Sequence, residues 1–379
     1  QEPQQMTQKL ILVLNCGSSS LKGAVLDNDS GEVLLSCLAE KLNLPDAYIT
    51  FKVNGEKHKV DLSAKPDHTG AVEALMEELK AHGLDSRIGA IGHRVVSGGE
   101  LYSESILVDD EVIAGIEKCI PLAPLHDTAF HQTMPEHAYK YAIPQEYYEK
   151  YGLRRYGAHG TSYRFVADET ARFLGKDKKD LRMVIAHLGN GASITAVANG
   201  ESRDTSMGLT PLEGLVMGTR SGDIDPAVFG FLAENANMTI TQITDMLNKK
   251  SGLLGLSGLS NDCRTIEEES GKGHPGAKLA LDVFIYRLAK YIGSMAVAAG
   301  GLDVLVFTGG IGENSDIIRE RVLGYLGFLG LKADHEANLK ARFGNAGVIT
   351  TADSSAVAVV IPTNEELMIA HDTARLSGL

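Results

Sequence analysis

The sequence predicts an α/β fold built from two similar halves, with a ligand cleft between the two domains. Three observations lead to this prediction. The chain has 379 residues, which is more than one hydrophobic core usually organises. A buried strand, a polar glycine turn and a second strand occur twice, about half a chain apart. Helical patterns lie between the strand patterns, as in folds that alternate the two elements.

The first strand–turn–strand unit opens the chain. Residues 10–14 are an unbroken apolar run, residues 15–20 contain one glycine and three serines, and residues 21–26 read as the second strand. The N–H groups and hydroxyls of such a turn can converge on phosphate oxygens, and Lys22 adds a positive charge. An ordinary solvated hairpin turn explains this segment equally well when it is taken alone.

The second unit follows the same plan. Residues 183–186 are apolar and lead into the glycine-containing turn 187–193, and residues 194–198 form a strand that ends at the hairpin turn Asn199-Gly200. The recurrence favours phosphate binding at both turns. Neither turn matches GxxxxGK[ST] or GxGxxG, so a P-loop and a Rossmann site are both disfavoured.

Helices and further strands complete the predicted halves. The helical patterns cover residues 72–79 and 277–299, and the later strands cover residues 304–307 and 357–361. Each of these strands ends in a polar segment, at residues 308–314 and 362–366 respectively. Strand ends of this kind are where α/β folds bind ligands.

Composition excludes several classes of protein. Hydrophobic residues make up 44% and charged residues 22% of the chain, which is too apolar for a disordered protein. The formal charge of −13 disfavours nucleic acid or an anionic membrane as a partner. The sequence has no run of roughly 18 apolar residues and no signal-peptide pattern, so we expect a cytoplasmic location. The four cysteines form no CxxC pair and are expected to be reduced. Residues 1–6 are expected to be a disordered tail or an expression remnant.

Two arginines lie among small residues that allow other atoms to approach closely. Arg94 is followed within five residues by two glycines, and Arg220 lies between Gly218 and Gly222. A guanidinium group binds carboxylate or phosphate in a bidentate manner, which suits a phosphoryl group in transfer. The alternative is a structural ion pair with a neighbouring carboxylate such as Asp223 or Asp225.

A cluster of histidines, hydroxyls and a carboxylate lies between predicted elements. In a phosphoryl-transfer site, His159 would donate to the moving phosphoryl group, and Asp127 would orient a substrate or hold Mg²⁺-bound water. A metal site of His126, Asp127, His131 and His137 is the alternative, but the spacing fits neither HExxH nor a structural zinc pattern. For any single histidine, a satisfied structural role is more common.

Six segments together resemble the acetate kinase family, and the resemblance runs from about residue 10 to residue 379. The segments are residues 15–22, 159–162, 187–193, 204–225, 309–314 and 362–366. The family belongs with sugar kinases, actin and the heat-shock chaperone ATPases. The resemblance therefore implies a duplicated actin-like, ribonuclease H-like α/β fold that closes over ATP in an interdomain cleft.

The resemblance also implies an activity and a domain division. The activity is reversible, Mg²⁺-dependent (or Mn²⁺-dependent) phosphoryl transfer from ATP to acetate, which gives acetyl phosphate and ADP. The N-terminal domain would cover residues 7–130 and 366–379, and the C-terminal nucleotide-binding domain would cover residues 131–365. The partners would be small molecules, without nucleic acid or membrane, and the family commonly forms homodimers.

The family resemblance also implies which individual residues bind the nucleotide and the metal. Asn15 and Glu365 would place Mg²⁺. Lys22, His187, Leu188, Gly189, Asn190 and Gly191 would face the phosphates of ATP or ADP. The adenosine side would be held by Asp262, Cys263, Arg264, Gly310, Ile311, Gly312, Glu313 and Asn314.

Roles for acetate and catalysis follow in the same way. Arg94 would bind the acetate carboxylate, and Val96, Leu125, Ala158 and Pro211 would wall the methyl pocket. His159 and Arg220 would stabilise the transition state, and Arg94 and Asp127 would complete the catalytic group. Acetate is already ionised at neutral pH, so positioning and charge neutralisation are expected to provide most of the catalysis.

The chain departs from the family pattern at two places, and a third residue bears on the choice of substrate. His126 directly precedes Asp127, where the family has a stretch long enough for a helix and a strand. We expect a missing segment there, visible as a chain break, whereas a normal peptide bond would point to reduced or absent activity. Ser97 replaces the usual histidine, and Ala158 is small enough for propionate to fit. The alternatives are a propionate or butyrate kinase and a non-catalytic actin-like nucleotide-binding protein.

Overall fold

The described residues divide into two compact units. A computed structural model describes residues 10–16, 20–94 and 127–378. The first unit contains the described residues up to 94 and from 364 onward, and the second contains residues 127–363. The predicted domain limits near residues 130 and 365 stay a prediction, because the limit near residue 130 lies close to residues that the structure does not describe.

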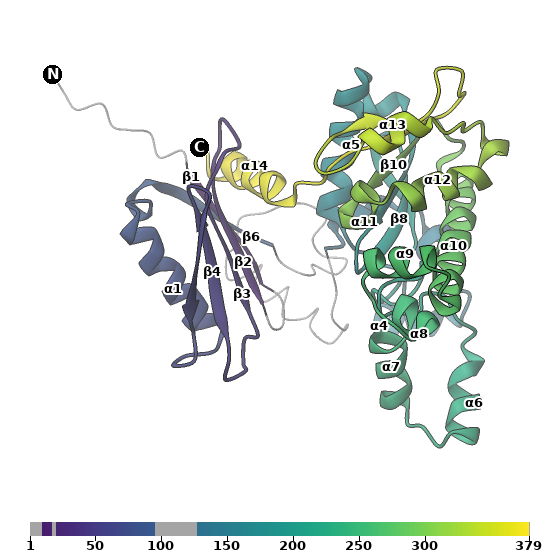
Figure 1. Ribbon diagram of the computed structural model, residues 1–379, viewed down its shortest axis with the longest axis horizontal. Coiled ribbons are helices and arrows are strands. Elements are labelled where there is room, and N and C mark those ends of the chain that lie inside the picture. Colours follow the sequence, from purple (N-terminus) through teal and green to yellow (C-terminus); the bar gives the residue numbers. More distant parts are fainter. Residues whose placement is uncertain (1–9, 17–19, 95–126, 379) are drawn as a thin grey trace. The chain divides into compact units, whose positions relative to one another are not determined.

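In its described residues, the first unit is a sheet with one helix on each face. Its elements are β1 (Leu10–Cys16), β2 (Leu21–Asp27), β3 (Val33–Glu40), β4 (Tyr48–Val53), β5 (Glu56–Asp61), α1 (His68–Ala81), β6 (Ile88–His93) and α14 (Glu365–Ser377). Helix α1 covers one face through Leu75 and Leu79, and α14 covers the other through Ala370 and Ala374. The last helix of the chain therefore packs on its first strand (Figure 1).

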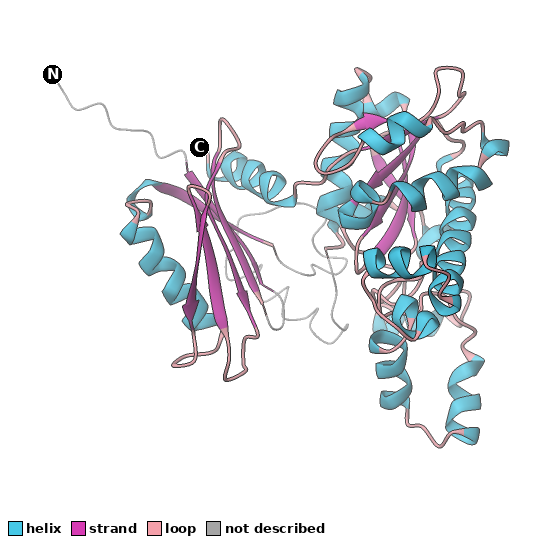
Figure 2. Cartoon of the chain, in the orientation of Figure 1, coloured by secondary structure: helices cyan, strands magenta, loops and turns pink. Residues whose placement is uncertain are grey.

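The second unit is larger and contains a sheet with helices on both faces (Figure 2). Its strands are β7 (Arg182–Leu188), β8 (Ala192–Ala198), β9 (Glu201–Thr205), β10 (Val304–Thr308), β11 (Gly347–Val348) and β12 (Val357–Val360). Its helices are α3 (Glu136–Tyr139), α4 (Gln145–Tyr151), α5 (Gly160–Leu174), α6 (Ala227–Asn235), α7 (Ile240–Lys249), α8 (Gly252–Ser257), α9 (Cys263–Gly271), α10 (Pro275–Ala299), α11 (Gly309–Asn314), α12 (Asp316–Tyr325) and α13 (His335–Lys340).

The two faces of the second sheet are packed by different helices. Helix α10 buries Leu281 and Phe284 on one face, and α5 buries Tyr163 and Val166 on the other. Local signals explain the bounds of α10: the His274 side chain accepts from the N–H of Ala277, and the helix ends at Gly300 with φ 79°.

Strand order confirms the predicted duplication. Within the described ranges the first sheet runs β5-β4-β3-β2-β1-β6 and the second β11-β12-β10-β7-β8-β9. Strands β1, β2 and β3 form an antiparallel meander, with β6 parallel to β1 on its other side. Strands β7, β8 and β9 repeat this meander, and β10 takes the place of β6. The polar segment after β10, expected only as a strand end, forms the short helix α11.

Some predicted features lie outside the described residues. These are Val96, Ser97, Leu125, His126 and the glycine–serine part of the first turn at residues 17–19. The expected chain break between His126 and Asp127 involves one of them and stays a prediction. No helix in the described parts of the chain is long and apolar enough to cross a membrane.

Candidate functional site

In the first unit, four of the predicted site residues lie at one edge of the sheet. Strands β1 and β6 are parallel neighbours, with Leu14 opposite His93, so their carboxyl ends meet at this edge. Asn15 lies near the end of β1, in register with Lys22 on β2. Arg94 directly follows β6, and its N–H donates to the carbonyl oxygen of Leu14 at 3.1 Å.

Charges of both signs meet at this edge. The Arg94 guanidinium lies 3.2 Å from the Glu365 carboxylate at the first position of α14, and both side chains are mostly buried. Lys22 forms an ion pair with Glu366. The Nε atom of Arg94 is buried and has no hydrogen-bond partner among the described residues. Arg94 therefore retains a donor that an anion can use.

In the second unit, two histidines are stacked and each is held by a serine. Nδ1 of His159 lies 2.7 Å from Oγ of Ser193, and Nδ1 of His187 lies 2.8 Å from Oγ of Ser162. The two imidazole rings are 4.1 Å apart between centroids and inclined by 20°. Ser162 also contacts the hydroxyl of Thr363 at 2.7 Å. Within the second unit, the structure thus brings Thr363 together with the segments 159–162 and 187–193, which are far from it in the sequence.

Asp127 lies at the start of α5, next to His159. Its carboxylate accepts from the N–H of Thr161 at 2.5 Å, and its backbone oxygen accepts from the N–H of Gly160 at 3.0 Å. A carboxylate is favourable at a helix N-terminus because it satisfies free N–H groups and faces the positive end of the helix dipole. Asp127 therefore orders the turn that carries His159.

Arg220 packs against the second glycine turn. A Cβ atom added to Gly191 would lie 3.2 Å from the Nη2 atom of Arg220, and one added to Gly218 would lie 2.0 Å from Oδ1 of Asn190. The N–H of Gly218 also donates to the carbonyl oxygen of Asn190 at 3.0 Å. Glycine is needed at position 218 because the two chain segments approach so closely.

The guanidinium of Arg220 is not neutralised by a described carboxylate. Its Nη1 atom donates to the carbonyl oxygen of Pro211 at 2.9 Å. Burial lowers the pKa of this side chain. For Arg220, the predicted alternative of an ion pair with Asp223 or Asp225 is wrong: these carboxylates are directed to the N–H groups of Gly214 and Ala227 and form no ion pair with it. For Arg94, a carboxylate partner is present in Glu365. A partly buried positive charge like that of Arg220 favours an anionic ligand.

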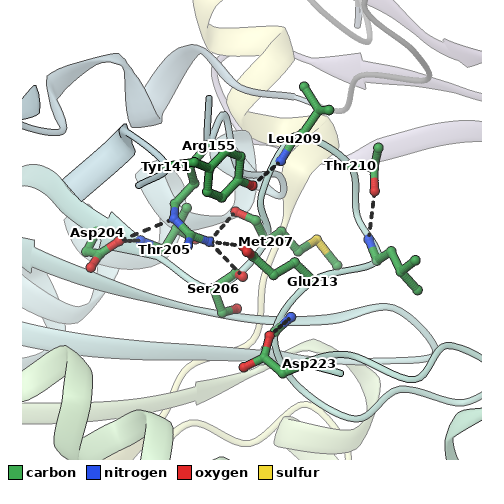
Figure 3. A network of polar contacts seen from close by, with 12 residues as sticks. Tyr141, Arg155, Asp204, Thr205, Ser206, Met207, Leu209, Thr210, Glu213 and Asp223 are labelled. Atoms are coloured by element: carbon green, nitrogen blue, oxygen red, sulfur yellow. Dashed lines mark hydrogen bonds and ion pairs between the residues drawn. The ribbon is translucent and has the colours of Figure 1, made fainter. Parts of the chain in front are cut away.

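A second arginine, which the sequence analysis missed, orders the loop that carries Pro211 (Figure 3). Nη1 of Arg155 donates to the carbonyl oxygens of Ser206 and Met207 at 3.1 and 3.3 Å and to the Glu213 carboxylate. Burial acts against the charge of Arg155, but Glu213 and other neighbours offset it and raise the pKa of the guanidinium. The sequence offered little to identify this network. Its basic residue is followed by Tyr156-Gly157, and its carboxylates, Asp204 and Glu213, come 49 and 58 residues later.

The same network connects this loop to the long helix. Tyr291 on α10 donates its hydroxyl to Asp223, and the other oxygen of Asp223 accepts from the N–H of Gly214 at 2.8 Å. Arg287 on α10 donates to the carbonyl oxygen of Ser221 at 2.8 Å. The backbone on both sides of Pro211 and Arg220 is therefore held by polar side-chain contacts.

The residues predicted for the adenosine side lie at helix starts near the same strand ends. Strands β7 and β10 are parallel, with Thr308 opposite His187, and α11 begins directly after β10. Asp262 caps α9 by accepting from the N–H of Arg264 at 2.9 Å. The amide of Asn261 reaches Oδ1 of Asn190 at 3.3 Å and so links this region to the glycine turn.

Several other residues predicted to bind the nucleotide are buried or contact neighbouring parts of the protein. Leu188 is fully buried, and burial raises the pKa of the Cys263 thiol. Burial also raises the pKa of Glu313, whose carboxylate lies 3.5 Å from the N–H of Thr363. Asn314 accepts from the N–H of Phe343 at 3.0 Å and thereby anchors a neighbouring loop.

The described residues do not support the alternative metal site. His131 is fully buried, with Nδ1 2.8 Å from Oγ of Ser202 and Nε2 2.8 Å from the carbonyl oxygen of Ala158. Burial lowers its pKa to about 4. Both ring nitrogens are engaged, so His131 has a structural role. No cluster of three or more His, Cys, Asp or Glu side chains suited to a metal occurs in the described ranges.

Comparison with known proteins points to one family. A profile described as the Acetokinase family matches residues 10–129 and 126–371. Acetate kinase 1 of Neisseria meningitidis serogroup B is 89% identical over 398 aligned positions, which cover 99% of this chain and all of the relative. The crystal structure of Porphyromonas gingivalis acetate kinase has a TM-score of 0.93 at 44% identity, covering 97% of this chain and 99% of that one. A propionate kinase from Francisella tularensis has a TM-score of 0.91 at 43% identity, covering 97% and 100%.

The comparisons also bear on the unusual junction. The alignment with the Neisseria relative spans 398 positions, whereas this chain has 379 residues, so it contains at least 19 positions without a residue in this chain. The two segments matched by the family profile meet at residues 126–129. Both observations agree with the expectation of a missing stretch at His126–Asp127.

Proposed function

The chain belongs to the acetokinase family, and we propose on that basis that it catalyses reversible phosphoryl transfer from ATP to acetate, giving acetyl phosphate and ADP. The observation that carries the proposal is the environment of Arg220. Its partly buried guanidinium lacks a carboxylate partner among the described residues and lies against the glycine turn at Gly191. A site that neutralises a transferring phosphoryl group needs such a fixed positive charge.

The chemistry requires no general base. One oxygen of the acetate carboxylate attacks the γ-phosphorus of ATP, the bond from that phosphorus to the β–γ bridging oxygen breaks, and ADP leaves with the electron pair. Arg220 would offset charge on the equatorial oxygens, and His159 would donate a hydrogen bond to one of them. Arg94 would hold the acetate carboxylate, which is consistent with its unpartnered Nε donor.

Asn15 and Glu365 fit the requirements of Mg²⁺. Their amide and carboxylate oxygens are hard donors, and they belong to the same unit as Lys22 and Arg94. Mg²⁺ usually takes one or two protein ligands and completes its shell with water and phosphate oxygens, so two side chains suffice. The metal would supply charge neutralisation at the nucleotide phosphates. In the structure, Glu365 also lies 3.2 Å from Arg94.

The phosphates of the nucleotide would face the turn at residues 187–191, and its adenosine side would face the starts of α9 and α11. The link from Asn261 to Asn190 supports this assignment, because it joins the two regions through side chains. Main-chain N–H groups of a glycine turn and of helix starts are suited to phosphate oxygens.

Propionate kinase activity is the second candidate. Ala158, assigned to the methyl pocket, is small and buried, so a longer acyl chain meets little steric resistance from it. The similarity to the Francisella propionate kinase supports the same candidate. One extra methylene changes specificity by only about 10–200-fold in a hydrophobic pocket, so both substrates are expected to react.

A cytoplasmic homodimer is part of the same proposal. Exposed apolar side chains support a second copy as partner, among them Phe231 on α6 (65% exposed) and Ile240 on α7 (74% exposed). Light scattering coupled to size-exclusion chromatography tests this directly, and a monomer at micromolar concentration contradicts it.

The test of function is hydroxylamine trapping of the acyl phosphate formed from ATP, Mg²⁺ and acetate, propionate or butyrate, on protein whose mass verifies the sequence. We expect the highest kcat/KM with acetate and loss of product on chelation of Mg²⁺. Preference for propionate or butyrate would keep the mechanism and change the substrate. Absence of any acyl phosphate while ATP still binds would overturn the proposal and favour a non-catalytic nucleotide-binding protein.

A further inference from the structure

Tyr163 is a fully buried ionisable side chain that the proposed mechanism does not use. It lies in the first turn of α5, and its hydroxyl is 2.5 Å from Oγ of Ser193. Ser193, near the start of β8, is also fully buried, and the same Oγ atom lies 2.7 Å from Nδ1 of His159. A tyrosine hydroxyl, a serine hydroxyl and the predicted catalytic imidazole therefore form a continuous chain.

The direction of the hydrogen bonds in this chain decides the tautomer of His159. The serine hydroxyl has one proton, so it donates to one neighbour and accepts from the other. Burial raises the pKa of Tyr163, which keeps the phenol protonated. A phenol is more acidic than an aliphatic hydroxyl and is the better donor of the two. This difference favours the arrangement in which Tyr163 donates to Ser193 and Ser193 donates to Nδ1 of His159.

A reverse arrangement is chemically allowed and has to be distinguished. The Tyr163 oxygen is also within reach of the Thr195 hydroxyl. If Tyr163 donated to Thr195, Ser193 would donate to Tyr163 and accept from a protonated Nδ1. The two arrangements place the proton on opposite nitrogens of His159, so a measurement of its tautomer separates them.

The imidazole of His159 is also restrained against rotation. The residue has a left-handed backbone with φ 56°, which is uncommon for a residue with a side chain, and it precedes the first residue of α5. Its ring is stacked on His187, which is itself held by Ser162. Nδ1 is therefore kept toward Ser193, and the opposite nitrogen is kept on the other edge of the ring.

We propose that Tyr163 and Ser193 are positioning residues that hold neutral His159 in the form protonated at Nε2. This inference deepens the proposed function and rests on it, because only a protonated Nε2 can donate to an oxygen of the transferring phosphoryl group. In the other tautomer, Nε2 presents a lone pair to negatively charged oxygens. The pair thus acts through His159 and does not touch the substrate.

The experiment combines nitrogen NMR with kinetics. ¹⁵N-labelled histidine is incorporated into the wild type and into Tyr163→Phe, Ser193→Ala and Ser193→Thr variants, and spectra are recorded without substrates at a pH where histidine is neutral. The signals of residue 159 are assigned by comparison with His159→Gln. Tyr156→Phe is the matched control, because it also removes a buried hydroxyl, which donates to the carbonyl oxygen of Gly152 at 2.7 Å.

We expect the wild type and Tyr156→Phe to show His159 protonated at Nε2. Tyr163→Phe and Ser193→Ala should show a tautomer mixture, with kcat lowered about 10–100-fold and the KM for acetate changed less than about twofold. Ser193→Thr keeps a hydroxyl and should retain the Nε2–H form. If Tyr163→Phe does not fold, the Ser193 pair and the wild-type spectrum still decide the question.

Two results would overturn the inference. One is a wild-type spectrum with the proton on Nδ1, which would support the reverse arrangement. The other is an unchanged tautomer in both Tyr163→Phe and Ser193→Ala, since any loss of kcat would then be structural. Failure of the proposed function is seen separately, as absence of acyl phosphate with the wild type, and leaves the tautomer measurement valid.

Discussion

Replacing Arg220 by alanine is the most direct perturbation of the proposed site. In the structure one guanidinium nitrogen is used to donate to Pro211, and another lies against the glycine turn at Gly191. The substitution removes a charge that no described carboxylate balances. Folding should change little, because the loss of one hydrogen bond to a backbone carbonyl costs about 1 kcal/mol.

The expected effect on the rate follows from these contacts. Loss of one fixed donor to a developing negative charge costs about 10²–10³-fold, and loss of an arginine that contacts a transferring phosphoryl group costs about 10³–10⁵-fold. One nitrogen of Arg220 is already used to donate to Pro211. We therefore expect the value at which the two ranges meet, which is the low end of the second range. This is a fall in kcat of about 10³-fold, or about 4 kcal/mol in the activation free energy.

The assay compares kcat and KM for acyl phosphate formation in the wild type, Arg220→Ala, Arg220→Lys and Arg321→Ala. Lysine keeps the charge but loses the forked geometry, so an intermediate kcat is expected. Arg321→Ala is the control, because it removes an exposed arginine on α12 that pairs with Asp282 and should change kcat less than about threefold. A kcat for Arg220→Ala within tenfold of the wild type, in folded protein, would refute the assigned role.

Three further predictions concern the nucleotide turn, the metal and the buried histidine. Gly218→Ala should raise the KM for ATP about tenfold, since one displaced contact of about 1.4 kcal/mol gives this factor and the new Cβ would lie 2.0 Å from Oδ1 of Asn190. Glu365→Gln should raise the Mg²⁺ concentration for half-maximal activity by at least about tenfold, measured by titration after chelation. In the folded protein, burial lowers the pKa of His131 to about 4, below its unfolded value of about 6.5. The neutral imidazole therefore contributes stability that is fully present above pH 6.5 and is lost as the pH falls toward 4. The contribution is about 3 kcal/mol, and His131→Gln should flatten the dependence of the urea midpoint between pH 7.5 and 5.

Each of these predictions has a control and a contrary result. Gly230→Ala lies in open space and should leave the KM for ATP unchanged; an equal effect in both glycine variants would contradict the steric argument. An unaltered Mg²⁺ titration in Glu365→Gln would remove that residue from the metal site. His371 is exposed on α14, and His371→Gln should leave the acid dependence of unfolding as in the wild type. If His131→Gln unfolds with the same pH dependence as the wild type, the buried imidazole is not its cause.

The sequence predicted the fold well where the signals were local. The two strand–turn–strand units are recognisable because apolar runs and glycine turns each occupy a few consecutive residues. The helix predicted over residues 277–299 is observed at Pro275–Ala299, and its start and end are determined by capping residues at its own termini. The segment after β10 was harder, because the short helix α11 has two glycines among its first residues and glycine weakens any helical signal.

The candidate site was predicted only in part. Local patterns and the family resemblance identified Arg94, His159 and Arg220 as candidates, and the structure supplies the environment of each. It did not identify Arg155, whose partner Glu213 is 58 residues away, nor Tyr163, whose partner Ser193 is 30 residues away. No spacing rule connects such pairs, since they become neighbours only when strands and helices pack.

What the sequence by itself determined is the alternation of strands and helices, the duplication and the chemical types available for phosphoryl transfer, because these depend on residues close together in the chain. Only the tertiary structure decided that Arg220 lacks a described carboxylate partner, that His131 is a neutral structural residue, and that Tyr163 reaches His159 through Ser193. The physical reason is that burial and the choice of hydrogen-bond partner depend on which distant segments exclude water together.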